Sequence, residues 1–130
     1  MENFLYHYRA IVKKVVDGDT VYCDVDLGFN FNNKLMIFRL AEINTPELKG
    51  NMREAGLKSK DFVIDKVMGK EIVLETFKDV KEKYGRYLAK VYFKENDQWV
   101  CLNELLVQNG LAEKYQHWYN TICFHLDVSL

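Results

Sequence analysis

The sequence has few of the features that mark linkers, fibres or membrane spans. Its 130 residues include one proline and seven glycines, and they contain no low-complexity stretch and no internal repeat. No apolar run approaches the roughly 20 residues that cross a bilayer. A chain of this length can bury a core without a metal or a disulfide. We therefore expect residues 1–130 to form a single soluble domain with no membrane partner.

Cysteine is also scarce. Cys23, Cys101 and Cys123 are odd in number and show no C-x-x-C spacing, which disfavours both a zinc site and a complete disulfide framework. The first ten residues, MENFLYHYRA, contain neither the basic segment nor the apolar segment of a secretory signal. A cytoplasmic location is the expectation, with a secreted origin left open.

The chain has no strong excess of charge of either sign. Eighteen basic and nineteen acidic residues give a net charge of −1, which excludes a protein that binds polyanions over its whole surface. The charge is unevenly distributed, because the stretch 78–94 has six basic residues against two acidic ones. An anionic partner should therefore meet the middle of the chain.

The first half of the sequence shows the alternation of apolar and polar residues that is typical of β-strands. In the segment TVYCDVDL the apolar positions are Val21, Cys23, Val25 and Leu27, which predicts a half-buried strand. Asp17-Gly18 before it is a signal for a two-residue hairpin of type I′, and GFNFNNK after it is a looser turn. The strands expected in this half cover 8–16, 20–27 and 35–40.

Helix signals follow. Asn51 and Glu54 have the spacing of a capping box, and Gly69 is a C-terminal stop, so we expect a helix over about 52–68. Two further strands, 71–77 and 87–93, and a short second helix beginning near Leu102 complete the order. Five strands with a helix between the third and the fourth are the pattern of an α+β, mainly β fold. The pattern predicts a five-stranded Greek-key barrel of the OB type with two or three helices, a fold that commonly binds oligonucleotides or oligosaccharides.

Three short motifs could carry chemistry. In VVDGDTV the turn alone accounts for Asp17, but Asp19 is a second carboxylate at a strand end and could bind a hard cation such as calcium. In FRLAEINTPE, Arg39 lies inside an apolar run, and Pro46 restricts Thr45 to extended backbone. The simpler interpretation of this segment is a strand with a surface arginine, followed by a turn with a surface glutamate. In the functional interpretation, the turn is a rigid backbone that positions Asn44 and Glu47.

The third motif, EKYGRYLAK, has a second arginine, Arg86, where a strand begins. A solvated charged hairpin is its simpler interpretation. Taken together, the motifs contain what phosphodiester cleavage requires. Guanidinium groups stabilise negative charge on phosphate oxygens, a cation neutralises one of these oxygens, and a carboxylate activates water.

The motifs DGDT, FRLAEINTPE, EKYGR and LNELLVQNGLA resemble, in order and approximate spacing, those of the staphylococcal nuclease (thermonuclease) family. The resemblance covers about Tyr8 to Ala112, and four ordered motifs are far more specific than any single one. It implies a calcium-dependent nuclease that hydrolyses phosphodiester bonds of DNA and possibly RNA and leaves 3′-phosphates.

The resemblance also implies roles for individual residues. Glu47 matches the general base, and Arg39 and Arg86 match the two arginines that bind the phosphate. Asp19 and the carbonyl group of Thr45 match calcium ligands. The residues that match the nucleotide-phosphate contacts are Lys83 and Tyr84.

Asn44 departs from the family pattern, which most often has aspartate at this position as a second calcium ligand. Asparagine keeps an oxygen ligand but removes one negative charge, so we expect weaker calcium binding, with the identity of the divalent ion left open. The segment after Ala112 also departs from the pattern. Tyr115, Trp118 and Tyr119 in this segment could stack on bases or pack in the core.

Two hypotheses follow from these residues. The first is a monomeric nuclease that acts on single-stranded DNA and possibly RNA and has no protein partner. The second is a nucleic-acid-binding OB module with weakened catalysis, for which Asn44 would be a first step. The presence of Arg39, Glu47 and Arg86 together favours the enzyme, because a binding module has no physical need for all three.

Overall fold

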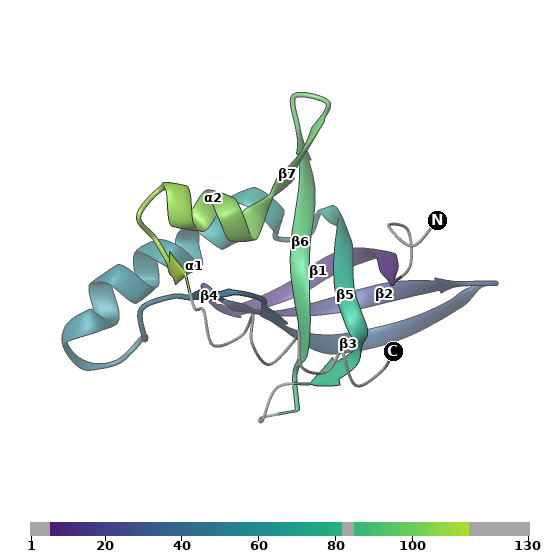
Figure 1. The fold of residues 1–130 in the computed structure, drawn as a ribbon, viewed down its shortest axis with the longest axis horizontal. Coiled ribbons are helices and arrows are strands. Elements are labelled where there is room, and N and C mark those ends of the chain that lie inside the picture. Colours follow the sequence, from purple (N-terminus) through teal and green to yellow (C-terminus); the bar gives the residue numbers. More distant parts are fainter. Residues whose placement is uncertain (1–5, 82–84, 115–130) are drawn as a thin grey trace.

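The structure, a computed structural model, describes residues 6–81 and 85–114. The described part of the chain forms two groups of strands, each followed by a helix (Figure 1). The elements are β1 (His7–Asp17), β2 (Thr20–Gly28), β3 (Phe31–Leu40), β4 (Ile43–Asn44), a 3-10 turn η2 (Gly50–Met52), α1 (Arg53–Val67), β5 (Glu71–Lys81), β6 (Tyr87–Glu95), β7 (Gln98–Cys101), α2 (Leu102–Gln108) and β8 (Glu113–Lys114).

Five of the strands form a closed barrel. The sheet order is β3-β2-β1-β5-β6-β7, and β3 also pairs in parallel with β6. This last pairing, between Phe38–Leu40 and Tyr87–Ala89, closes the ring of β3, β2, β1, β5 and β6. The predicted fold class, an α+β protein built on a five-stranded OB barrel, is therefore confirmed. No helix in the described part of the chain is long and apolar enough to span a membrane.

The predicted alternation in β2 is correct except at its end. Val21, Cys23 and Val25 are buried in the barrel, whereas Leu27 is 47% exposed. The reason is that β2 and β3 continue beyond the barrel as a two-stranded arm, which projects to one side in Figure 1. This arm turns at Phe29–Asn30, where both residues have positive φ. The expected loose turn over GFNFNNK is thus a tight two-residue turn, and β3 begins four residues earlier than predicted.

Helix α1 agrees with its predicted range to within one residue at each end, but the capping box is wrong. Asn51 lies in the preceding 3-10 turn, and the N-cap residue is Met52, which makes no side-chain capping hydrogen bond. Gly69 follows the helix with a φ of 72°, as a C-terminal stop requires. Val63 and Val67 anchor α1 in the barrel core.

Helix α2 is fastened to the barrel by one buried polar side chain. Asn103 is 3% exposed, and its Oδ1 accepts a hydrogen bond from the backbone N–H of Val91 at 3.0 Å. Its Nδ2 donates to the carbonyl groups of Ala41 at 2.9 Å and Ala89 at 3.2 Å. This asparagine therefore ties β6 to the chain segment that leaves β3, just before the region of the predicted site.

Candidate active site

The β1–β2 hairpin carries the first motif. The turn is Gly18–Asp19, between the ends of β1 and β2, and the backbone N–H of Asp19 donates to Oδ1 of Asp17 at 3.1 Å. The type I′ assignment is wrong, because neither Gly18 nor Asp19 has a positive φ. Gly18 is required for space instead. A Cβ at this position would lie 2.8 Å from Cβ of Ser59 and 2.9 Å from Cγ2 of Thr45. The hairpin therefore fits closely against α1 and against the segment Asn44–Glu47, which we call the NTPE turn.

Arg39 is positioned by contacts on both of its terminal nitrogens. It lies directly opposite Thr20 in the β2–β3 pairing and is 6% exposed. Its Nη1 donates to the carbonyl group of Leu40 at 2.9 Å. Its Nη2 lies 3.2 Å from Oδ2 of Asp19 and 3.2 Å from Oδ1 of Asn44. The buried guanidinium is thus paired with a carboxylate, as its burial requires.

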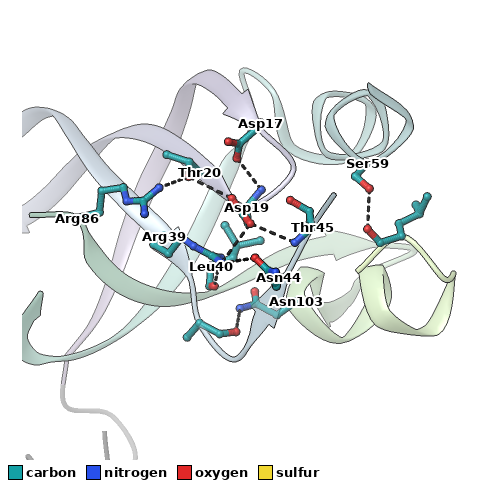
Figure 2. A network of polar contacts seen from close by, with 12 residues as sticks. Asp17, Asp19, Thr20, Arg39, Leu40, Asn44, Thr45, Ser59, Arg86 and Asn103 are labelled. Carbon is teal, nitrogen blue, oxygen red and sulfur yellow. Dashed lines mark hydrogen bonds and ion pairs between the residues drawn. The ribbon is translucent and has the colours of Figure 1, made fainter. Parts of the chain in front are cut away.

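Asp19 is the centre of the polar network drawn in Figure 2. Its Oδ2 also accepts a hydrogen bond from the backbone N–H of Thr45 at 3.2 Å, and its Oδ1 accepts one from Oγ1 of Thr20 at 3.3 Å. The same Thr20 hydroxyl accepts a hydrogen bond from Nη1 of Arg86 at 2.9 Å. Three strands and the NTPE turn therefore bring both arginines to one carboxylate, Arg39 directly and Arg86 through Thr20.

The NTPE turn is packed tightly against α1. A Cβ on Gly56 would lie 2.5 Å from the carbonyl oxygen of Glu47 and 2.9 Å from that of Pro46. The glycine therefore lets the helix approach the backbone of the turn. On the other side, Ile43–Asn44 pairs with Glu113–Lys114. Glu47 itself is exposed to solvent, whereas its backbone packs closely against α1.

The two aspartates of the hairpin differ in acidity. Burial, followed by the hydrogen bond to Asp19 and the charge of Asp19, raises the pKa of Asp17 to about 6. Burial alone would also raise the pKa of Asp19. The hydrogen bond from Asp17, the charge of Arg39 and the contacts with Thr45 outweigh it and lower the pKa of Asp19 below 3.8. The lowered pKa favours the ionised form of Asp19, the form that a cation ligand requires.

The oxygen atoms near Arg39 suit a hard cation. Oδ2 of Asp19 and Oδ1 of Asn44 converge on one positively charged group, Nη2 of Arg39, at 3.2 Å each. Calcium prefers carboxylate, amide and backbone carbonyl oxygens, which are the ligand types predicted at Asp19, Asn44 and Thr45. The donor types at these three positions therefore suit calcium, and the two side-chain oxygens contact Arg39 in this structure. Within 6–81 and 85–114 no three His, Cys, Asp or Glu side chains could hold a metal together.

The structure thus brings together four of the predicted residues, namely Asp19, Arg39, Asn44 and Thr45, and it joins Arg86 to them through a hydroxyl. Glu47 follows directly on the same turn. Lys83 and Tyr84 lie outside the described residues, as do Tyr115, Trp118 and Tyr119, and the roles expected of them stay predictions.

Sequence reasoning missed the linking role of Thr20, the role of Asp17 as acceptor for the hairpin, and the two close-packed glycines. The first two are visible in the DGDT motif, whereas Gly56 has no sequence signal beyond being a glycine inside a helix.

Comparison with known proteins gives a consistent result. The model of the family described as staphylococcal nuclease homologue matches residues 37–127. A thermonuclease of Staphylococcus hyicus is 33% identical over 108 residues, which cover 81% of this chain and 57% of that protein. An uncharacterised protein of Methanocaldococcus jannaschii is 32% identical over 130 residues, covering 84% of this chain and 60% of that protein.

A more distant match is endonuclease YhcR of Bacillus subtilis, which is 29% identical over 115 residues, covering 85% of this chain and 9% of that protein. The chain therefore spans at most about 60% of the length of these relatives. Most of its length, including the end of β3, the NTPE turn, α1 and α2, falls inside the family match. Together with the barrel and the cluster around Asp19, this match shows that the chain belongs to the staphylococcal nuclease family.

Proposed function

We propose that the protein is a calcium-dependent nuclease that hydrolyses phosphodiester bonds of DNA, and of RNA, and leaves 3′-phosphates. The observation that carries the proposal is the convergence of Arg39, Asp19 and Asn44 within 3.2 Å contacts, with Arg86 joined through Thr20. The names of the relatives, a thermonuclease and an endonuclease, support the same class of reaction.

In the proposed reaction Glu47 takes a proton from a water molecule, which attacks the phosphorus atom. The bond from phosphorus to the 5′ oxygen breaks, the 5′ oxygen takes up a proton from solvent water, and the phosphate stays on the 3′ oxygen. Arg39 and Arg86 donate hydrogen bonds to the phosphate oxygens, on which charge increases in the transition state. Calcium, when bound, would neutralise a phosphate oxygen as a Lewis acid.

The contacts of Arg39 hold its guanidinium group in place before substrate binds. Its guanidinium is already aligned by the Leu40 carbonyl and by Asp19, so substrate binding requires no search for a rotamer. Oxygen ligation of a cation by Asp19 and Asn44 would draw these oxygens from Nη2 of Arg39 and leave that nitrogen to the phosphate. Substrate and cation are therefore expected to bind cooperatively.

The alternative function is a nucleic-acid-binding OB module with weak catalysis, and the neutral side chain of Asn44 favours it. Calcium affinity depends on the number of charged ligands, and the proposed set here has only one, Asp19. An endonuclease assay decides between the two functions.

The test is cleavage of a labelled single-stranded DNA, and of an RNA of the same sequence, with calcium and with chelator. We expect the wild type to cut in calcium, Glu47→Gln and Arg39→Ala to be inactive though folded, and Asn44→Asp to cut at lower calcium concentrations. Glu54→Gln, in the exposed first turn of α1, and Asn32→Asp, on the exposed arm, are matched controls. DNA binding without cleavage by the wild type at any calcium concentration would establish the binding module. Full activity of Glu47→Gln would refute the assigned base.

A further inference from the structure

The outer face of the barrel continues beyond the proposed active site along β1, β2 and β3. Thr20 and Tyr22 are two residues apart on β2, so their side chains extend from the same face. The strand pairing sets Thr20 opposite Arg39 and Asp17, and it sets Tyr22 opposite Ile37 and Lys14. Two adjacent rows therefore cross the three strands on one face. The row of Tyr22 lies about 7 Å from the row of Thr20, comparable to the length of one nucleotide in an extended strand.

A β-bulge brings Lys14 to this face. The β1–β2 register shifts between Val12 and Lys14, so β1 has one more residue than β2 at this point. Val12 and Val15 are consequently both buried while Lys13 and Lys14 between them are both exposed. A regular strand would direct Lys14 into the core. Bulges are known to redirect side chains in this way next to functional sites.

The two neighbouring lysines make different contacts. The ammonium group of Lys14 lies 5.7 Å from the centre of the Tyr22 ring, whereas Lys13 lies 3.9 Å from a carboxylate oxygen of Asp24. In the part of the chain that the structure describes, Lys14 has no carboxylate partner. An exposed cation–π contact is weak. Lys14 can therefore exchange it for a phosphate at little cost.

From this arrangement we propose a nucleotide subsite formed by Tyr22, Lys14 and Ile37. The half-exposed ring of Tyr22, with the side chain of Ile37 beside it, is a stacking surface for a base or a sugar. Lys14 binds the phosphate of the same nucleotide. Ring stacking accepts any base, so the subsite recognises single-stranded nucleic acid without sequence preference. The inference rests on the proposed function, because it places this nucleotide next to the phosphate that Arg39 and Arg86 would hold.

The test measures the affinity of the calcium-loaded Glu47→Gln protein for labelled oligonucleotides of two to six nucleotides by fluorescence anisotropy. We expect affinity to rise when the oligonucleotide becomes long enough to reach Tyr22. Adding Tyr22→Ala should lower the affinity for these longer oligonucleotides about tenfold. Adding Tyr22→Phe should leave the affinity unchanged because the ring remains. Lys14→Ala should lower the slope of log affinity against log salt by about 0.7, the effect of one phosphate contact on a single strand.

Lys13→Ala is the matched control, because Lys13 lies next to Lys14 in sequence but faces Asp24. The subsite is overturned if oligonucleotides bind and the wild type cuts them, while Tyr22→Ala and Lys14→Ala bind every length as the parent does. It is also overturned if Lys13→Ala and Lys14→Ala change the salt slope equally, which would indicate a diffuse charge effect. If the protein neither binds nor cuts an oligonucleotide of any length, the proposed function fails and the subsite fails with it. Thermal unfolding of each variant separates loss of the subsite from loss of the fold.

Discussion

Substitution of Gly56 by alanine tests how strongly the rigid NTPE turn contributes to catalysis. The added Cβ would lie 2.5 Å from the carbonyl oxygen of Glu47, and 2.9 Å from the carbonyl oxygen of Pro46. Both contacts are with backbone atoms, so no side-chain rotation can relieve them. Because protein interiors are close-packed, the turn and the helix must separate by roughly 0.5–1 Å.

The magnitudes predict that activity suffers more than stability. Overpacking of this kind costs about 1–3 kcal/mol, and the higher helix propensity of alanine returns about 1 kcal/mol. The net loss, about 1 kcal/mol, lowers the melting temperature by only a few degrees. A displacement of about 1 Å in a catalytic group, in contrast, can reduce the rate about 100-fold. Gly56→Ala should therefore reduce kcat by about 10- to 100-fold in a protein that is still folded.

The assay compares kcat and KM for calcium-dependent DNA cleavage, together with thermal unfolding, in the wild type, Gly56→Ala and Lys58→Ala. Lys58 is exposed on the same helix, so its substitution should leave kcat unchanged. A Gly56→Ala protein with wild-type kcat and wild-type stability would refute the reasoning, because the turn would then have yielded without consequence. Loss of activity only in parallel with unfolding would refute the catalytic part.

Three further predictions concern stability. Because burial and Asp19 raise the pKa of Asp17 from 3.8 to about 6, the native state loses stability as the pH rises through this window. A pKa shift of this size corresponds to a loss of about 3 kcal/mol in the free energy of unfolding, which solvent screening reduces to about 1 kcal/mol. Asp17→Asn should therefore raise the melting temperature in chelator at pH 7.5 and not at pH 3.5. Asn103→Leu leaves the N–H of Val91 and the carbonyl of Ala41 buried without partners; urea unfolding should show a loss of about 3 kcal/mol, with the exposed Asn109→Leu as control. Calcium should raise the melting temperature of Asn44→Asp more than that of the wild type, because a protein at 100 times its Kd for a ligand is stabilised by about 2.7 kcal/mol. Equal shifts in both proteins would exclude Asn44 as a ligand.

Local sequence signals were sufficient for most of the barrel. All five predicted strands are present, and α1 lies within one residue of its expected bounds at each end. These elements depend on apolar periodicity, which is written in adjacent residues. The errors lie where local rules compete with long-range packing. The Asp17-Gly18 pair predicts a turn with left-handed backbone. The structure requires a glycine at position 18 for another reason, namely the close approach of the side chains of Ser59 and Thr45.

The arm of β2 and β3 also shows that local sequence patterns miss structure that depends on pairing between segments. The segment from Phe31 to Lys34 contains asparagines and a lysine, so it has no apolar alternation to mark it as a strand. It is a strand because β2 provides a paired backbone for it. Backbone pairing between segments depends on register and does not need an apolar face, so the sequence pattern could not reveal it.

By itself the sequence determined the order of the five barrel strands and two helices, the residue types of the candidate site and its family, because periodicity and ordered motifs are properties of the linear chain; the short strands β4, β7 and β8 were not predicted. Only the tertiary structure decided that Arg39 contacts Asp19 and Asn44 at once, that Arg86 joins them through Thr20, and that a bulge in β1 brings Lys14 to Tyr22. These contacts link segments up to 66 residues apart. They exist because closure of the barrel aligns three strands and one turn, a geometric condition that no single segment contains.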